Sequence, residues 1–195
     1  MPHADSSLVP EEVKTKSQFW THVHGQLEPL LDGQRNWVSN LANTSSLIYN
    51  ALLAFPTHFG PDPDKAVNWC GFYIDSTRFP QSTDSNVEGN RLLLGPFCGK
   101  PACQFINVTP GKARGVCADA FMDAETKLVP EVDSYPGHIA CDGETKSEIV
   151  CPLIHGNQVL GVLDLDCLAM SGFDEEDQKG LEKIVELVVN ACDWH

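Results

Sequence analysis

The chain has few basic residues. Its 195 residues include 13 lysines and arginines against 27 aspartates and glutamates, which gives a formal net charge of −14. Such an excess of negative charge repels phosphate backbones and anionic membrane surfaces. The composition therefore predicts a protein that binds neither nucleic acid nor a membrane.

Long apolar runs are also missing. No run approaches the roughly 20 residues that a bilayer crossing needs, and residues 1–7 lack the basic head and apolar stretch of a secretory signal. We therefore expect a cytoplasmic protein. In a reducing compartment its eight cysteines are expected to be buried or catalytic thiols and not structural disulfides.

A third absence concerns metal sites. The chain has no Cys-x-x-Cys pair, which is the strongest sequence signal of a zinc site. Cys98 and Cys103, with four residues between them, are a loose half-site, and His138 with Cys141 would supply the other half. Zinc is the weaker interpretation, because a lone histidine in a loop more often makes hydrogen bonds. We expect no metal.

The order of the predicted elements indicates an α+β fold in one domain. A flexible tail is predicted over residues 1–10 and the folded domain over 11–195, with a central antiparallel sheet flanked by N- and C-terminal helices. The expected helices cover 10–31, 36–55 and 117–124, with a last one capped by Asp174. The expected strands cover 67–74, a segment from residue 91, 148–154 and 159–166, the last two joined by a turn at 155–158.

Two carboxylates stand at the end of the last predicted strand. Side chains alternate along a strand, so Asp164 and Asp166 share one face with Leu160 and Val162. Two carboxylates about 7 Å apart on a buried strand repel each other. Either a cation lies between them or one holds a proton, and both outcomes suit a site. The alternative is that the strand simply ends in solvent at Asp166.

A third carboxylate, Glu148, joins them only if the hairpin has the right register. A two-residue turn at 156–157 pairs Glu148 with Leu165 on the opposite face, whereas a three-residue loop pairs it with Asp164. We predict the odd-length loop or a compensating bulge, because only then do the three carboxylates converge.

Seven of the eight cysteines divide into two groups. Four lie in predicted apolar strands, near a strand end or on a helix face, where cysteine acts as a small hydrophobe: Cys70, Cys151, Cys167 and Cys192. Three others, Cys103, Cys117 and Cys141, precede Glu148, and Cys141 lies in a loop rich in proline and glycine. Together with the acids and the aromatic residues Trp69 and Tyr73, these thiols suggest two-electron redox chemistry on a small polar molecule.

Seven segments carry a resemblance to a known family. They are Asn68–Tyr73, Leu94–Phe97, Gly99–Cys103, Gly115–Cys117, Pro136–Asp142, Ser147–Val150 and Gly161–Asp166. In these segments, which lie within residues 18–190, the chain closely resembles the free methionine-(R)-sulfoxide reductases, enzymes built on a single GAF domain.

The resemblance implies a mechanism without a cofactor. Cys141 is implied to attack the sulfoxide sulfur of free L-methionine-(R)-sulfoxide, leaving a sulfenic acid. Cys103 is implied to condense with it to a disulfide that thioredoxin reduces. Cys117 would be an alternative or relay thiol, and the family also implies a homodimer.

The carboxylates and aromatic residues fit that chemistry. Sulfoxide oxygen leaves only when protonated, so one of Glu148, Asp164 and Asp166 is expected to be a neutral acid, with Glu148 in the catalytic set. The others would hold the α-ammonium of a free amino acid, which a peptide-linked methionine lacks. Trp69 and Tyr73 would form the wall against the methyl-sulfinyl end.

The chain departs from the family pattern in two places. Cys98 stands where a polar residue without a thiol is expected, within a predicted turn at 97–100, and it adds a disulfide competitor. Residues 107–110 lengthen the segment between Cys103 and Cys117 and are predicted to cover the pocket.

Two other functions compete with this interpretation. One is a GAF module that binds a small ligand or senses redox state without turnover; such modules are usually joined to an effector domain, and the three family cysteines would then be unnecessary. The other is a peptide methionine sulfoxide reductase, but the sequence has no Gly-Cys-Phe-Trp nucleophile motif.

Overall fold

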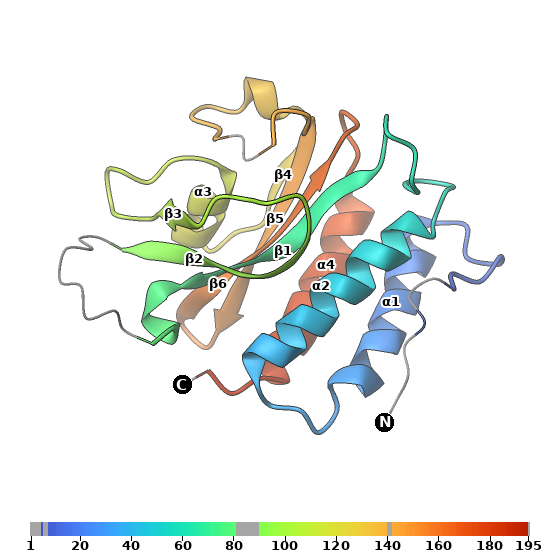
Figure 1. Ribbon diagram of the computed structural model, residues 1–195, viewed down its shortest axis with the longest axis horizontal. Coiled ribbons are helices and arrows are strands. Elements are labelled where there is room, and N and C mark those ends of the chain that lie inside the picture. Colours follow the sequence, from blue (N-terminus) through green and yellow to red (C-terminus); the bar gives the residue numbers. More distant parts are fainter. Residues whose placement is uncertain (1–4, 6–7, 81–89, 140–141, 195) are drawn as a thin grey trace.

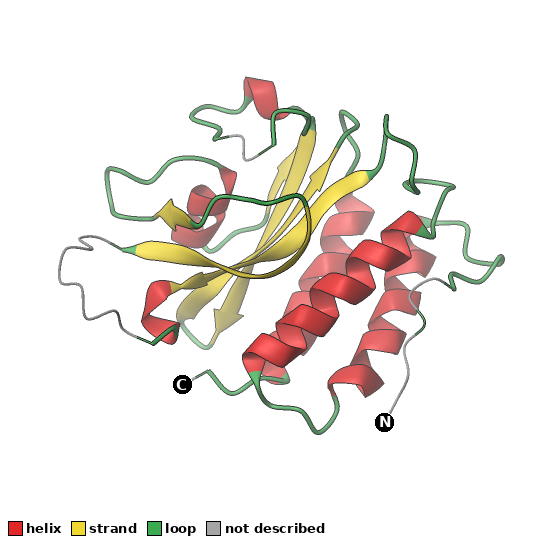
Figure 2. Cartoon of the chain, in the orientation of Figure 1, coloured by secondary structure: helices red, strands yellow, loops and turns green. Residues whose placement is uncertain are grey.

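The computed structural model describes residue 5 and residues 8–80, 90–139 and 142–194. These residues form an antiparallel sheet of six strands in the order β3-β2-β1-β6-β5-β4. Helices α1, α2 and α4 cover one face of the sheet, and α3 with its neighbouring loops covers the other (Figure 1, Figure 2). The predicted α+β class with a central antiparallel sheet is confirmed. The division into a tail and a domain at residue 10 stays a prediction.

The elements follow one another as helices, then strands, then a closing helix. Their bounds are α1 (Lys16–Leu31), α2 (Trp37–Leu53), β1 (Val67–Asp75), η1 (Ser76–Arg78), β2 (Arg91–Gly99), β3 (Phe105–Asn107), α3 (Val116–Asp123), β4 (Lys127–Val129), η2 (Val132–Ser134), β5 (Ser147–His155), β6 (Gln158–Cys167) and α4 (Glu175–Asn190). None of the helices described is long and apolar enough to span a bilayer.

The helix boundaries follow local capping chemistry. Helix α1 begins at Lys16 and not at the predicted residue 10, because Thr15 caps it in a capping box with Gln18. It ends before Gly33, whose φ of +75° is a left-handed conformation that favours glycine. Asp174 caps α4 as predicted, again through a capping box.

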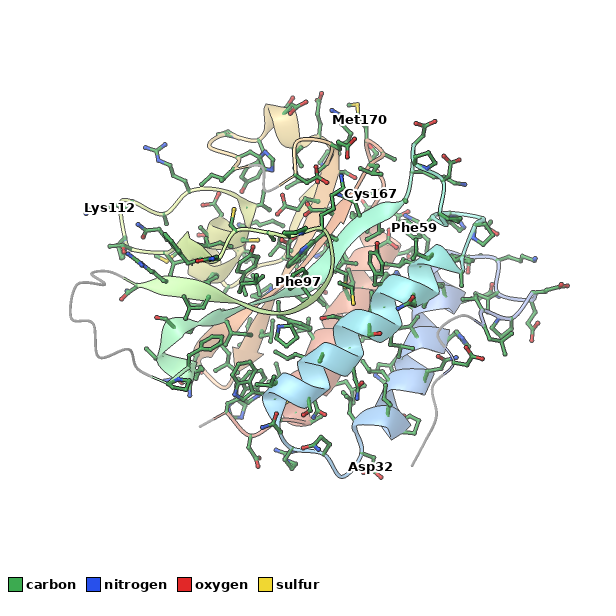
Figure 3. The ribbon with its side chains drawn as sticks, in the orientation of Figure 1. Asp32, Phe59, Phe97, Lys112, Cys167 and Met170 are labelled. Carbon is green, nitrogen blue, oxygen red and sulfur yellow. The ribbon has the colours of Figure 1, made fainter. Side chains whose placement is uncertain are left out.

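The sheet separates two apolar cores. The larger core lies between the sheet and helices α1, α2 and α4, whose packing is visible in the stick view (Figure 3). The smaller core lies under α3 and contains Trp69 and Tyr73, which confirms that these aromatic residues share one face of β1. The functional pocket lies on this second face.

Strand β2 corrects the turn predicted at residues 97–100. Phe97 and Cys98 remain in the strand, paired with Gly71 and Cys70 of β1. The Phe97 ring also stacks on Trp69 with 5.5 Å between ring centroids. This packing extends the strand to Gly99 despite the glycine and lysine that favour a turn locally.

The β5–β6 hairpin uses the predicted bulge. His155 pairs with Gln158, so the loop has two residues, Gly156 and Asn157. Further along, Leu153 pairs with Gly161 and Ile154 with Val159, which leaves Leu160 of β6 as the extra residue.

The bulge decides which side chains face the pocket. It pairs Glu148 with Asp166 and puts them on one face. The expectation of convergence through a bulge is thus confirmed, while the odd-length loop and the direct partner Asp164 were wrong. Leu160 was also wrongly placed with the aspartates: it packs in the core under the helices with Leu163, since the extra residue reverses the alternation at that point.

Candidate active site

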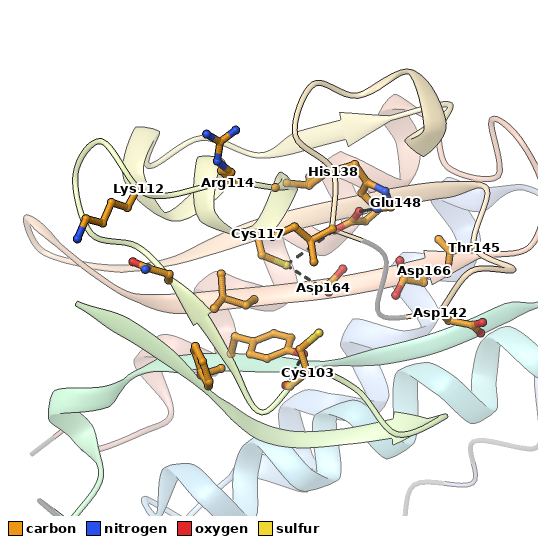
Figure 4. Close-up of a pocket in the computed structure, with 17 residues that line it drawn as sticks. Cys103, Lys112, Arg114, Cys117, His138, Asp142, Thr145, Glu148, Asp164 and Asp166 are labelled. Carbon is orange, nitrogen blue, oxygen red and sulfur yellow. Dashed lines mark hydrogen bonds and ion pairs between the residues drawn. The ribbon is translucent and has the colours of Figure 1, made fainter. Parts of the chain in front are cut away.

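A pocket of about 230 Å³ opens on the α3 side of the sheet (Figure 4). Strands β5 and β6 contribute three acidic residues, Glu148, Asp164 and Asp166, and Asp142 in the loop before β5 is a fourth. Helix α3 contributes Cys117 at its first turn, and the segment before β3 contributes Cys103. The structure therefore brings together, in one cavity, five residues that the sequence singled out.

The three carboxylates converge as predicted. Glu148 and Asp164 are only 5% and 6% exposed, so neither is freely solvated. Burial raises the pKa of Asp164 well above its usual range, and the negative charges of Asp166 and Glu148 raise it further. Burial, followed by the charges of Glu148 and Asp142, also raises the pKa of Asp166. This part of the pocket therefore favours a protonated acid.

The two carboxyl oxygens of Asp164 differ in their hydrogen bonding. Its Oδ2 accepts a hydrogen bond from the Cys117 thiol at 3.3 Å, whereas its buried Oδ1 has no hydrogen-bond partner among the described residues. A buried carboxyl oxygen without a partner is costly, and Asp164 lines the cavity. A ligand that donates a hydrogen bond would satisfy it.

Cys117 lies against the acids. Its thiol also reaches Glu148 Oε1 at 3.8 Å. Burial raises the pKa of Cys117 well above its usual range, and the charges of Asp164 and Glu148 add to the effect. This cysteine therefore stays a protonated thiol, which is a poor nucleophile.

Cys103 is held at the opposite wall. The Tyr73 hydroxyl donates a hydrogen bond to the Cys103 carbonyl oxygen at 2.9 Å, and both residues line the cavity. Trp69 stacks on Tyr73 at 5.7 Å between centroids without lining the cavity itself. Of the two predicted wall residues, Tyr73 thus faces the pocket and Trp69 supports it from behind.

Cys141, the predicted attacking thiol, lies outside the described residues. Ile139 before it and Asp142 after it both line the cavity. Asp142 is tethered by Lys100 at 3.0 Å and by the Asn68 side-chain amide at 3.0 Å. His138, which the sequence paired with Cys141 as a possible zinc half-site, faces Glu148 with 3.5 Å between Nε2 and Oε2.

The sequence did not single out two cations of the pocket, Lys112 and Arg114. Both line the end away from Asp142 and Asp166 (Figure 4). They belong to the segment after β3, and of the 107–110 extension Asn107 lines the pocket. That the extension covers the pocket stays a prediction. The signal available in the sequence was the two basic residues just before Gly115. Gly115 has a φ of +90° and is the N-cap of α3, without a side-chain hydrogen bond to the helix.

Of the two zinc half-sites considered in the sequence, the one formed by His138 and Cys141 includes a residue outside the described part of the chain. Among the described residues, the donors that gather within 4.8 Å of one another are those of Cys117, Glu148 and Asp164. Neither Cys98, which lies in β2, nor Cys103, which lines the pocket, belongs to that group. Because the Cys117 thiol donates to a carboxylate, the group has the character of a proton-sharing cluster.

Comparisons with known proteins agree with this geometry. Residues 66–192 match the GAF domain family. The chain is 46% identical over 166 residues to the free methionine-R-sulfoxide reductase of Saccharomyces cerevisiae, covering 85% of this chain and 81% of the relative. It is 35% identical to the Escherichia coli protein of the same name, covering 87% and 86%.

A solved structure extends the likeness to three dimensions. The free methionine-R-sulfoxide reductase of Neisseria meningitidis in complex with its substrate superposes with a TM-score of 0.76, at 31% identity and with 95% of each chain covered. Fold, pocket and relatives agree, and the chain belongs to the GAF-domain family of free methionine-R-sulfoxide reductases.

Proposed function

We propose that this protein reduces free L-methionine-(R)-sulfoxide to L-methionine. The observation that carries the proposal is the cluster of three carboxylates and a thiol in one pocket, where the buried Oδ1 of Asp164 has no hydrogen-bond partner in the described part of the chain. The names of the yeast and E. coli relatives support the same substrate.

The cluster supplies the proton that the reaction needs. Glu148, Asp164 and Cys117 each place a side-chain oxygen or sulfur within 4.8 Å of the others, and burial with the neighbouring negative charges raises the pKa of Asp164. Two buried carboxyl groups this close favour a state in which one of them is protonated. We propose that Glu148 passes this proton to the sulfoxide oxygen. The oxygen then leaves as a hydroxyl group and not as an oxide.

The thiols carry the electrons. The Cys141 thiolate attacks the sulfoxide sulfur, the protonated oxygen transfers to Cys141 as a sulfenic acid, and methionine leaves. The Cys103 thiol condenses with the sulfenic acid, releasing water and forming a disulfide, which the dithiol of thioredoxin reduces. The raised pKa of Cys117 argues against this residue as the attacking thiol. No cofactor is required.

The pocket also explains a preference for the free amino acid. Aspartates 164 and 166 offer negative charge to the substrate's α-ammonium group, while Arg114 and Lys112 offer positive charge to its α-carboxylate. Neither cation makes an ion pair with the acids in the described part of the chain. Tyr73, backed by Trp69, packs against the methyl-sulfinyl end.

Replacing Arg114 with alanine is expected to raise the KM for the free sulfoxide about tenfold with little change in kcat. A charge-assisted hydrogen bond to the carboxylate is worth roughly 1.5–3 kcal/mol, and it is equally present in ground and transition states. Adding Lys112→Ala should raise KM further. Lys183→Ala on α4 removes the same charge from the opposite layer and should leave KM unchanged. An unaltered KM in the double variant would exclude these cations from substrate binding.

A coupled assay tests the whole proposal. With thioredoxin, thioredoxin reductase and NADPH, the protein should consume NADPH in the presence of free L-methionine-(R)-sulfoxide. It should be nearly inactive with the S epimer and with peptide-linked sulfoxide. A GAF module that only binds a ligand or senses redox state would consume no NADPH beyond one equivalent, and equal rates with both epimers would reject the assignment. We further expect a homodimer, which light scattering on the purified protein would measure.

A further inference from the structure

Two cysteines outside the pocket stand directly opposite each other. Cys70 of β1 and Cys98 of β2 are register partners in the antiparallel pair, between the pairs Trp69–Gly99 and Gly71–Phe97. Opposed residues on neighbouring strands have Cα atoms about 4.5–5.5 Å apart and side chains on the same face. A disulfide needs Cα atoms about 4.4–6.8 Å apart. The strand register therefore gives Cys70 and Cys98 the backbone separation that a disulfide requires.

The pair faces the helices, away from the carboxylates. Cys70 belongs to the core beneath α1, α2 and α4, on the side of the sheet opposite the pocket. Both cysteines are close enough to Tyr49 of α2 to affect its titration. Burial raises the pKa of Tyr49, and the charges of Cys98 and Cys70 raise it further. Both thiols thus lie close to α2 and on the other face of the sheet from Asp164.

The two thiols differ in access to solvent. Cys70 is completely buried, whereas Cys98 is partly exposed. A small oxidant can therefore reach Cys98 first, and the thiol opposite it is shielded from bulk solvent. An accessible thiol beside a second thiol is the arrangement of a sulfenic acid with its resolving partner.

We propose that Cys70 and Cys98 form a second, reversible disulfide that is separate from the pocket thiols. Hydrogen peroxide oxidises the Cys98 thiol to a sulfenic acid and is itself reduced to water. The Cys70 thiol then attacks the sulfenic sulfur, a second water leaves, and an S–S bond joins β1 to β2. A dithiol reductant reverses the bond by exchange.

The disulfide would stabilise the fold and would not take part in the catalytic cycle. It closes the chain between β1 and β2, which includes η1, and so restricts that segment in the unfolded state. The pocket side chains are on the opposite face. Cys98→Ser is therefore expected to keep the reductase activity while removing the disulfide.

The test maps disulfides after peroxide treatment. Wild-type protein and a variant with Cys103→Ser, Cys117→Ser and Cys141→Ser are oxidised, their remaining thiols are alkylated, and the digests are analysed by mass spectrometry. In both proteins we expect the peptides that contain Cys70 and Cys98 to be linked, with a combined mass lower by two hydrogen atoms. The oxidised proteins should also have a higher melting temperature than the reduced ones. Dithiothreitol should reverse both changes. Because the wild type is mapped as well, a folding defect of the triple variant does not decide the outcome.

Controls separate this pair from the other thiols. Cys98→Ser should abolish the link and the rise in melting temperature, whereas Cys192→Ala should keep both. Burial raises the pKa of Cys98 and raises that of Cys70 well above its usual range, so both the oxidation of Cys98 and the attack by Cys70 should be faster at about pH 9 than at about pH 7, as the thiolate fractions grow. Recovery of both thiols in alkylated form, Cys98 as a sulfinic acid, or Cys98 linked to a different cysteine would each overturn the proposal.

Discussion

Serine in place of Cys141 is expected to abolish methionine release even in a single turnover. A hydroxyl is far less nucleophilic than a thiolate at neutral pH, and Cys117 in the pocket is held as a protonated thiol by burial and by the acids. Without an attacking thiolate, no sulfenic acid forms. The measurement mixes enzyme in excess with the sulfoxide, without reductant, and quantifies free methionine by chromatography.

Cys103→Ser should behave differently from Cys141→Ser. It should release one methionine per enzyme molecule and then stop, because attack still occurs but no resolving thiol condenses with the sulfenic acid. A sulfenic acid probe should label this stalled enzyme. Cys192→Ala, on the helix side of the sheet, is the matched control and should turn over normally. A stoichiometric burst from Cys141→Ser would show that another cysteine attacks.

Glu148→Gln is expected to lower kcat by a factor on the order of 10² to 10⁴, the range for loss of a general acid. Glutamine keeps the shape of the side chain but cannot carry the proton that the sulfoxide oxygen takes. Asp164→Asn should lower kcat as well, because asparagine cannot hold a titratable proton beside Glu148. Glu186→Gln on α4 is a matched control that should leave kcat unchanged. A near-normal kcat in both pocket variants would show that these carboxylates do not take part in the chemical step.

The same cluster sets the expected pH dependence of the chemical step. The reaction needs a protonated acid, and the pKa of Asp164 is raised by burial and by Asp166. Single-turnover rates should therefore fall as pH rises through that raised pKa, although the thiolate fraction of an ordinary cysteine grows in the same direction. In Asp164→Asn this alkaline decline should shift or disappear. A decline that is identical in the variant would point to a different acid.

Local signals were enough for most of the elements. Helix caps such as Asp174, the glycine at the turn of the hairpin and the alternation of Asp164 with Asp166 depend on a few neighbouring residues, and each was predicted from them. The order of the cysteine and carboxylate segments also identified the family. These features follow from backbone preferences and side-chain periodicity, which short stretches of sequence specify.

Tertiary structure decided what short stretches cannot encode. The face and partner of Glu148 depend on a bulge at Leu160, which the strands adopt only once both faces are packed. The contact of Cys117 with Asp164 depends on where α3 docks. The opposition of Cys70 and Cys98 likewise exists only in the β1–β2 pair. The chemical groups and their order can be read along the chain, but pairing between distant strands determined which of them meet, because register is set by the summed packing of whole strands.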